Sequence, residues 1–237
     1  MEAARFYRYR TPYVHKFFTD LTTELGLSRE SVLLDIGCGD GRLGAGLAPY
    51  VKKIIAVDAS AEMLGRAIKM DNIEYVQIDL SKEVFACESR AHHALIGRTI
   101  SYLPGDKLRQ TLERSLLPGA NVLVCGSLFD RGTPWVPKYV ALRNSYGQRN
   151  WQDPFGEEKL ISIGYEKVGK IVSFALARVT EKYLVKNALA YGSSAHNIRA
   201  RLTEFRKELH KILAPNIVNG TLEAKVGSWA YVYSKRK

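Results

Sequence analysis

The chain has little cysteine and no long apolar run. Its three cysteines, Cys38, Cys87 and Cys125, are widely spaced, form no CxxC pair and lie near no histidine cluster, which excludes a disulfide miniprotein and a cysteine-rich zinc site. No stretch of about 18 apolar residues is present, as a membrane-spanning helix would need, and the N-terminal residues MEAARFYRYR lack the apolar part of a signal peptide. We therefore expect a reduced, cytoplasmic protein without a metal and without a membrane partner.

Acidic residues are scarce in the second half of the chain. Residues 1–130 hold 16 basic and 16 acidic residues, whereas residues 131–237 hold 19 basic and 8 acidic ones, which accounts for the whole net charge of +11. Such an excess is typical of proteins that attract an acidic substrate or a nucleic acid. The alternative is a solvated helix face followed by a basic tail.

Strand and helix patterns alternate regularly up to residue 130. With 237 residues, 46% of them hydrophobic, the chain is long enough for one main domain. Short apolar runs predict strands at 31–36, 53–58, 73–77, 93–96 and 121–125, and apolar periodicity predicts helices at 12–26, 41–50, 61–70 and 106–115. This alternation indicates an α/β sheet with helices on both faces, which binds ligands at the carboxyl ends of its strands.

Beyond residue 130 the alternation breaks. Residues 130–156 are rich in proline, glycine and aromatics and are interpreted as an irregular insertion, so that residues 130–170 form a lid over a single domain spanning residues 1–237. Residues 170–190 are expected to be rich in strand. Helical periodicity at 197–213, within a helical segment at 190–215, precedes a last strand at 228–233.

The strongest chemical signal is a glycine cluster that follows the first strand directly. Gly37, Gly39 and Gly41 alternate there, which permits a tight turn and a close approach of the backbone to a ligand. Three successive strands each end near an acid, namely Asp35, Asp58 and Asp79. These carboxylates can accept hydrogen bonds from an ammonium, from both hydroxyls of a ribose and from an adenine amino group, respectively.

A second interpretation uses the same residues. Residues 39–44, GDGRLG, fit the GxGxxG pattern of dinucleotide-binding proteins, in which Asp58 would bind the ribose of NAD. The turn begins earlier, at Gly37, and Asp35 would lie unfavourably close to a pyrophosphate. We therefore favour a ligand that carries an ammonium, a ribose and an adenine. NAD binding, and glycines that only form a turn, are the less favoured alternatives.

The segments LLDIGCGDGRLG, IIAVDASAEML and VQIDL resemble the first three motifs of the class I S-adenosylmethionine-dependent methyltransferases, and the resemblance extends over most of the chain. It implies a Rossmann-like sheet, S-adenosylmethionine as the cofactor, a glycine turn that holds the methionine part and apolar groups beside the adenine. The expected cofactor-binding residues are Arg10, Asp35, Gly37, Gly39, Gly41, Asp58, Met63, Asp79, Leu80 and Gly97.

The segments RFYRYRTPY and IGRTISYL partly match a small bacterial branch of this family, the type 11-like enzymes that act on small molecules. Where that branch has His-Trp after the fourth strand, this chain has Ser101-Tyr102. His15 and Tyr102 are therefore the catalytic candidates, either of which can instead be structural. The expected acceptor-binding residues are Tyr13, Trp135, Tyr139, Tyr146 and Trp151, although these aromatics can equally fix the lid to the sheet.

These observations favour methyl transfer to a small-molecule acceptor with an acidic or aromatic group. The first alternative is an RNA or protein methyltransferase whose basic C-terminal half binds the substrate. The second is a binding module that retains the cofactor without transferring its methyl group. The sequence indicates neither the acceptor atom nor the oligomeric state.

Overall fold

The computed structural model describes residues 5–147 and 156–236, which divide into two compact units. We call residues 15–126, 156–173 and 228–236 the sheet unit, and residues 5–14, 127–147 and 174–227 the helical unit. The segment expected to be a lid contributes residues to both units, and its action as a lid stays a proposal. The description of residues 1–237 as a single domain likewise stays an expectation.

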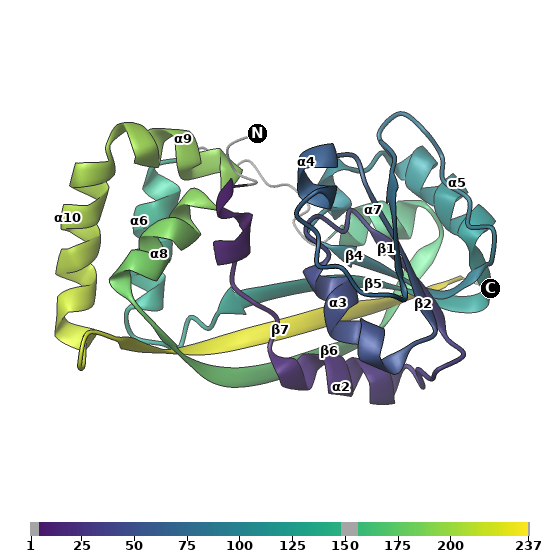
Figure 1. Cartoon of the computed structure of the whole chain (residues 1–237), viewed down its shortest axis with the longest axis horizontal. Coiled ribbons are helices and arrows are strands. Elements are labelled where there is room, and N and C mark those ends of the chain that lie inside the picture. The colour runs from purple at the N-terminus through teal and green to yellow at the C-terminus, as the bar shows by residue number, and fades with distance from the viewer. Residues whose placement is uncertain (1–4, 148–155, 237) are drawn as a thin grey trace. The chain divides into compact units, whose positions relative to one another are not determined.

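A seven-stranded sheet, to which every strand contributes residues of the sheet unit, has the order β3-β2-β1-β4-β5-β7-β6 (Figure 1). The first five strands pair in parallel, β3 with β2, β2 with β1, β1 with β4 and β4 with β5. Their carboxyl ends therefore lie at one edge of the sheet. The bounds are β1 Val32–Ile36, β2 Lys53–Asp58, β3 Ile73–Gln77, β4 Ala91–Gly97, β5 Leu116–Phe129, β6 Tyr165–Val179 and β7 Leu222–Lys235.

Helices of the sheet unit pack on both faces of its sheet. Because side chains alternate along a strand, Leu34 and Ile36 join one apolar cluster with Leu108 and Leu160, while Asp35 points to the opposite face, toward Gly44. The bounds are α2 His15–Glu24, α3 Arg42–Leu47, η2 Ala48–Tyr50, α4 Ala61–Leu64, η3 Ile100–Tyr102, α5 Gly105–Ser115 and α7 Glu157–Ser162. This arrangement confirms the expected Rossmann-like class I fold.

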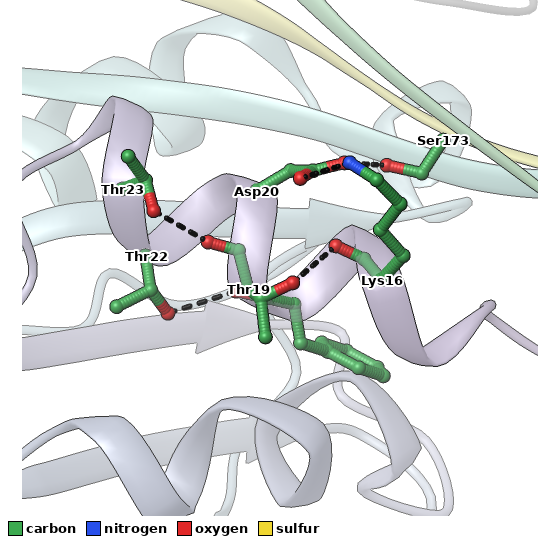
Figure 2. Close-up of polar contacts among 7 residues, drawn as sticks. Lys16, Thr19, Asp20, Thr22, Thr23 and Ser173 are labelled. Carbon is green, nitrogen blue, oxygen red and sulfur yellow. Dashed lines mark hydrogen bonds and ion pairs between the residues drawn. The ribbon is translucent and has the colours of Figure 1, made fainter.

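Polar contacts join α2 to β6 within the sheet unit (Figure 2). The hydroxyl of the buried Ser173 donates to the carboxylate of Asp20, which Lys16 also contacts at 2.6 Å. Both contacts favour the ionised carboxylate, and the contact with Lys16 has the larger effect. The pKa of Asp20 therefore lies below its ordinary value. On α2 itself, three threonine hydroxyls donate to carbonyl oxygens of the preceding turn.

Ser173→Ala is expected to lower the free energy of unfolding at pH 7 by about 1 kcal/mol, because Asp20 loses one donor to its charge. A lowered pKa stabilises the fold above the unfolded value of 3.8, and this contribution is lost as the pH falls below it. Urea unfolding near pH 3 should therefore give a smaller decrease in the free energy of unfolding for this substitution than urea unfolding at pH 7. Ser89→Ala, at an exposed loop position, is the matched control; an equal loss at both pH values would contradict the assignment.

The helical unit contains α6 Val136–Ser145, α8 Glu181–Leu189, α9 Gly192–Ala200 and α10 Leu202–Leu213, with the short turns η1 Tyr7–Tyr9 and η4 Ala214–Asn216. The four α-helices pack against one another. Leu184, Ile198, Phe205 and Leu209 are fully buried and supply the apolar interior of this unit.

Three expectations about local structure were wrong. Residues 130–156 are not irregular throughout, because α6 begins at Val136 with Pro137 in its first turn, where proline is tolerated. Residues 181–189 form α8 rather than strand, since the Thr180 hydroxyl caps the helix by accepting from the Tyr183 N–H. The helix expected at 61–70 ends at Leu64, directly before Gly65.

Candidate functional site

The turn from β1 to α3 depends on three glycines with left-handed backbones. Gly37, Gly39 and Gly41 have φ angles of 68°, 59° and 74°, which residues with a Cβ adopt only under strain. The Gly37 and Cys38 N–H groups donate to the Val57 carbonyl at 2.8 and 3.0 Å. These bonds hold the turn against the carboxyl end of β2.

Two of these glycines also leave room for neighbouring side chains. A Cβ on Gly37 would lie 2.3 Å from Cγ2 of Thr99, and one on Gly41 would lie 2.1 Å from the hydroxyl oxygen of Tyr75. Thr99 follows β4 and donates to the carbonyl oxygens of Gly37 and Gly97, both at 3.1 Å. Thr99 thus joins the carboxyl end of β4 to the glycine turn, a role that the sequence analysis missed.

Asp58 connects the end of β2 to both adjacent loops. One carboxylate oxygen accepts from the Gly39 N–H at 2.8 Å, and the other accepts from the Ser60 N–H at 2.8 Å. Ser60 in turn caps α4 by accepting from the Met63 N–H. Because each carboxylate oxygen has two lone pairs, the fixed and half-buried Asp58 retains an acceptor position on each oxygen for a pair of hydroxyls.

Asp35 is a buried carboxylate that the described residues leave without a hydrogen-bond partner. Its side chain is 0% exposed, and neither carboxylate oxygen has a partner. Burial raises the pKa of Asp35 to about 7; the nearby Gly44 N–H opposes this rise in part, and the Asp58 and Asp40 carboxylates add to it. A buried polar group without a partner is costly, so this residue fits a ligand that brings a donor or a positive charge.

The ligand-free protein should become less stable as the pH rises from 3.8 to about 7. Because the folded protein holds the Asp35 proton up to about pH 7 and the unfolded chain releases it near pH 3.8, the free energy of unfolding falls as the pH rises between these values. Asp35→Asn should remove this decrease in the free energy of unfolding, which amounts to at most about 4 kcal/mol over the interval. Urea unfolding of both proteins at pH 5 and pH 8 measures it; parallel pH profiles would contradict the buried, proton-holding state.

Asp79 lies two residues after β3 and binds its own turn. Its carboxylate accepts from the Ser81 hydroxyl at 2.6 Å and from the Ser81 N–H at 3.0 Å, and it contacts Lys82 at 3.0 Å. These contacts, those from Ser81 first, lower the pKa of Asp79 to about 2. Leu80 and Met63 are buried and carry the apolar character expected beside an adenine, while the binding of adenine by these residues stays a prediction.

The two catalytic candidates are exposed. His15 is the first residue of α2, and Tyr102 ends the turn η3 after β4 with 73% of its surface accessible. Tyr102 therefore presents its hydroxyl to solvent near the chain segment that leaves Gly97. Catalysis by either residue stays a prediction.

The aromatic residues expected to bind the acceptor lie inside the helical unit. Trp135 and Tyr139 are 2% and 0% exposed, and their polar atoms are bonded within the unit, Trp135 to the Glu223 carbonyl and Tyr139 to Leu184 and Asn187. Tyr146 is also buried, with its ring edge-on to Phe205. These contacts favour the packing alternative for the three side chains, and their role toward an acceptor stays a prediction. Trp151 lies outside the described residues.

Arg10 and Tyr13 belong to the helical unit, whereas Asp35, Asp58, Asp79 and the three glycines belong to the sheet unit. Arg10 contacts the ring of Tyr191, with its guanidinium carbon 3.8 Å from the ring centroid. Tyr13 is half-buried. The roles expected for Arg10 toward the cofactor and for Tyr13 toward the acceptor stay predictions.

Comparisons with curated proteins find methyltransferases. A family model described as a methyltransferase domain matches residues 33–119. The chain is 32% identical over 74 residues to an uncharacterized methyltransferase of Schizosaccharomyces pombe, covering 31% of this chain, and 28% identical over 124 residues to ribosomal RNA small subunit methyltransferase C of Chromohalobacter salexigens, covering 49% of this chain. It spans only 28% and 37% of the lengths of these relatives.

Solved structures match nearly the whole chain. A type II methyltransferase structure from Anaeromyxobacter dehalogenans has a TM-score of 0.74 at 16% identity, with 96% of this chain and 97% of that chain covered. A methyltransferase of Geobacter sulfurreducens in complex with S-adenosyl-L-homocysteine has a TM-score of 0.51 at 18% identity, with 96% and 93% covered. Residues 33–119 therefore match a methyltransferase domain, within a chain that has the fold of the class I S-adenosylmethionine-dependent methyltransferases.

Proposed function

We propose that this protein binds S-adenosylmethionine in the sheet unit and transfers its methyl group to a small-molecule acceptor with an acidic or aromatic group. The observation that carries the proposal is Asp35, a fully buried carboxylate without a partner among the described residues, on the strand that leads into the glycine turn. A cationic amine is the ligand group that such a carboxylate favours. The methionine part of the cofactor supplies one.

The residues of the sheet unit hold the cofactor and orient it. Asp58 accepts from the two ribose hydroxyls with the positions left free by Gly39 and Ser60, Asp79 accepts from the adenine amino group, and Met63 and Leu80 line the adenine. When bound, S-adenosylmethionine supplies a methyl group on a sulfonium, which a lone pair of the acceptor displaces in line to leave a neutral thioether. Much of the catalysis of such a displacement comes from positioning. Tyr102 orients the acceptor, whose proton, where it carries one, is released to water.

A reduced, cytoplasmic setting is part of this proposal. Cys38, Cys87 and Cys125 are free and buried, as expected of thiols that are never oxidised to structural disulfides. No helix in the described ranges is long and apolar enough to cross a membrane.

The second candidate function is methylation of RNA. It is supported by the excess of 19 basic over 8 acidic residues in residues 131–237 and by the similarity to a ribosomal RNA methyltransferase. Because binding to a polyanion weakens steeply with salt, a strong salt dependence of substrate binding would favour this candidate over a small acceptor.

The test is incubation with methyl-labelled S-adenosylmethionine and an extract of the source cells, separated afterwards into small-molecule, RNA and protein fractions. We expect label in the small-molecule fraction, and none with Asp58→Ala. Label in RNA or protein would contradict the proposed acceptor class. Cofactor binding without label in any fraction would favour a binding module.

A further inference from the structure

The chain between β4 and α5 has a strained backbone at Arg98. Gly97 ends β4, and Arg98 follows it with a φ angle of 63°, a left-handed conformation that is unfavourable for a residue with a Cβ. Thr99 comes next, and its hydroxyl donates to the carbonyl oxygens of Gly37 and Gly97. A backbone of this kind persists only where contacts with the surrounding structure hold it in place.

Lys159 of α7 supplies such a contact. Its ammonium donates to the carbonyl oxygens of Ile100 and Leu103, at 2.7 and 2.5 Å. Ile100 begins the turn η3 and Leu103 directly follows it. The turn's own bond between these two residues, from the Leu103 N–H to the Ile100 carbonyl, is long at 3.3 Å. Because a hydrogen bond from a charged donor is roughly twice as strong as a neutral one, the lysine supplies much of the polar support of η3.

The helix that carries Lys159 is packed directly against η3. Leu160, the next residue, is 0% exposed and belongs to the same apolar cluster as Ile100 and Leu103. At the start of the helix, a Cβ on Gly156 would lie 2.0 Å from Cγ1 of Ile100, so the backbone approaches the turn more closely than a larger residue permits. The ammonium therefore bonds to η3 from a helix that is itself fixed.

We propose that Lys159 is a positioning residue of the cofactor site. By holding η3 it keeps Thr99 bonded to Gly37, in the glycine turn that takes the methionine part of the cofactor, and it fixes the place of Tyr102. Lys159 acts through these residues, all of which belong to the sheet unit. The inference rests on the proposed methyl transfer and extends its machinery to a side chain that lies 59 residues after Ile100 in the sequence.

The experiment compares variants of the full chain by hydrogen exchange and by calorimetric titration with S-adenosylhomocysteine. Lys159→Met nearly keeps the length of the side chain and removes its ammonium, whereas Lys159→Arg keeps a cation with N–H donors. Lys52→Met is the matched control, because Lys52 is exposed, contacts the exposed Glu30 at 3.4 Å and precedes the amino end of β2. Thermal unfolding of each variant sets a working temperature at which it is folded.

Lys159→Met should loosen η3 and weaken the cofactor site. We expect the Tyr102 and Leu103 N–H groups, which form the turn's own bonds, to exchange about tenfold faster, as the loss of a charged hydrogen bond predicts. The dissociation constant for S-adenosylhomocysteine should rise about tenfold, because the turn must then be ordered on binding. Lys159→Arg should lie between Lys159→Met and the wild type, and Lys52→Met should match the wild type.

A double-mutant cycle shows whether the effect passes through Thr99. Thr99→Val nearly keeps the shape of the side chain and removes the hydroxyl that bonds to Gly37. If Lys159 positions Thr99, Lys159→Met should weaken binding much less in the Thr99→Val protein than in the wild type. Additive losses of affinity would overturn the proposal.

Two further outcomes would overturn the positioning role. Faster exchange in η3 with wild-type affinity in Lys159→Met would make the lysine structural only, and unchanged exchange would show that it does not hold the turn. Should Lys159→Met not fold, Lys159→Arg takes its place in both measurements, with smaller changes expected in the same direction. Failure of the proposed function appears separately, as a wild type that does not bind S-adenosylhomocysteine, while hydrogen exchange still reports whether Lys159 holds η3.

Discussion

Asp58→Ala should lower the affinity for S-adenosylhomocysteine by about 100-fold or more. Two hydrogen bonds from ribose hydroxyls to a carboxylate contribute roughly 1.5–3 kcal/mol each, which corresponds to at least two powers of ten in the dissociation constant. The substitution also releases the Gly39 and Ser60 N–H groups, so the glycine turn loses one of its bonds to the end of β2 and keeps those to the Val57 carbonyl. Isothermal titration calorimetry of the wild type and the variant measures the effect.

Two further variants make this result specific. Asp58→Asn preserves the shape of the side chain but removes its charge and one acceptor oxygen, so its affinity should lie between those of the wild type and Asp58→Ala. Asp71→Asn, at an exposed acid before β3, should leave the affinity unchanged. Thermal unfolding without ligand shows whether the variants remain folded. Wild-type affinity in a folded Asp58→Ala protein would refute the assignment of this residue.

Gly37→Ala should lower the free energy of unfolding by about 2–4 kcal/mol and weaken cofactor binding. The φ angle of 68° strains any residue with a Cβ. The new methyl group would also lie 2.3 Å from Cγ2 and 2.6 Å from Cβ of Thr99, so rotating the threonine side chain does not remove the overlap. Thr99 must move and give up its bonds to Gly37 and Gly97, which adds an overpacking cost.

Gly26→Ala is the matched control for Gly37→Ala. Gly26 has a φ angle of 60°, and a Cβ there would meet no atom within 4 Å, so this variant measures the backbone strain alone, roughly 1 kcal/mol. It should bind S-adenosylhomocysteine as the wild type does. Equal losses of stability in the two variants, measured by urea unfolding, would show that the contact with Thr99 does not constrain the turn.

The parallel part of the sheet could be predicted from the sequence because its signals are local. Residues 53–58 and 73–77 were expected as strands and form β2 and β3 with these bounds. Continuous apolar runs followed by glycine or an acid are typical of buried parallel strands. Ser60, which caps α4, is a local signal of the same kind, since N-cap preferences depend on one side chain.

The helical unit was less predictable because its signals conflict. Proline and glycine near α6 suggested a loop, although Pro137 lies in the first turn of the helix where it costs little. The segment that contains α8 follows the long strand β6 without a glycine or proline between them, and only Thr180 marks the change. In such segments the packing of one helix on another decides the structure, and that packing is not visible in a local pattern.

Prediction of the candidate site from the sequence has the same limit. Spacing placed Asp35, Asp58 and the three glycines at strand ends, but it could not reveal that Asp35 lacks a partner or that Asp58 already bonds to both loops. The burial of Trp135 and Tyr139 also depends on tertiary contacts, since an aromatic residue in a proline-rich segment can equally be exposed or buried.

The most direct test of the central claim is a crystal structure of the protein with S-adenosylhomocysteine bound. We predict that the ribose hydroxyls lie within hydrogen-bond distance of the Asp58 carboxylate and that the methionine ammonium lies beside Asp35, along the turn formed by Gly37, Gly39 and Gly41. Binding of the ligand elsewhere, or occupation of this turn by the pyrophosphate of NAD but not by S-adenosylhomocysteine, would contradict the account.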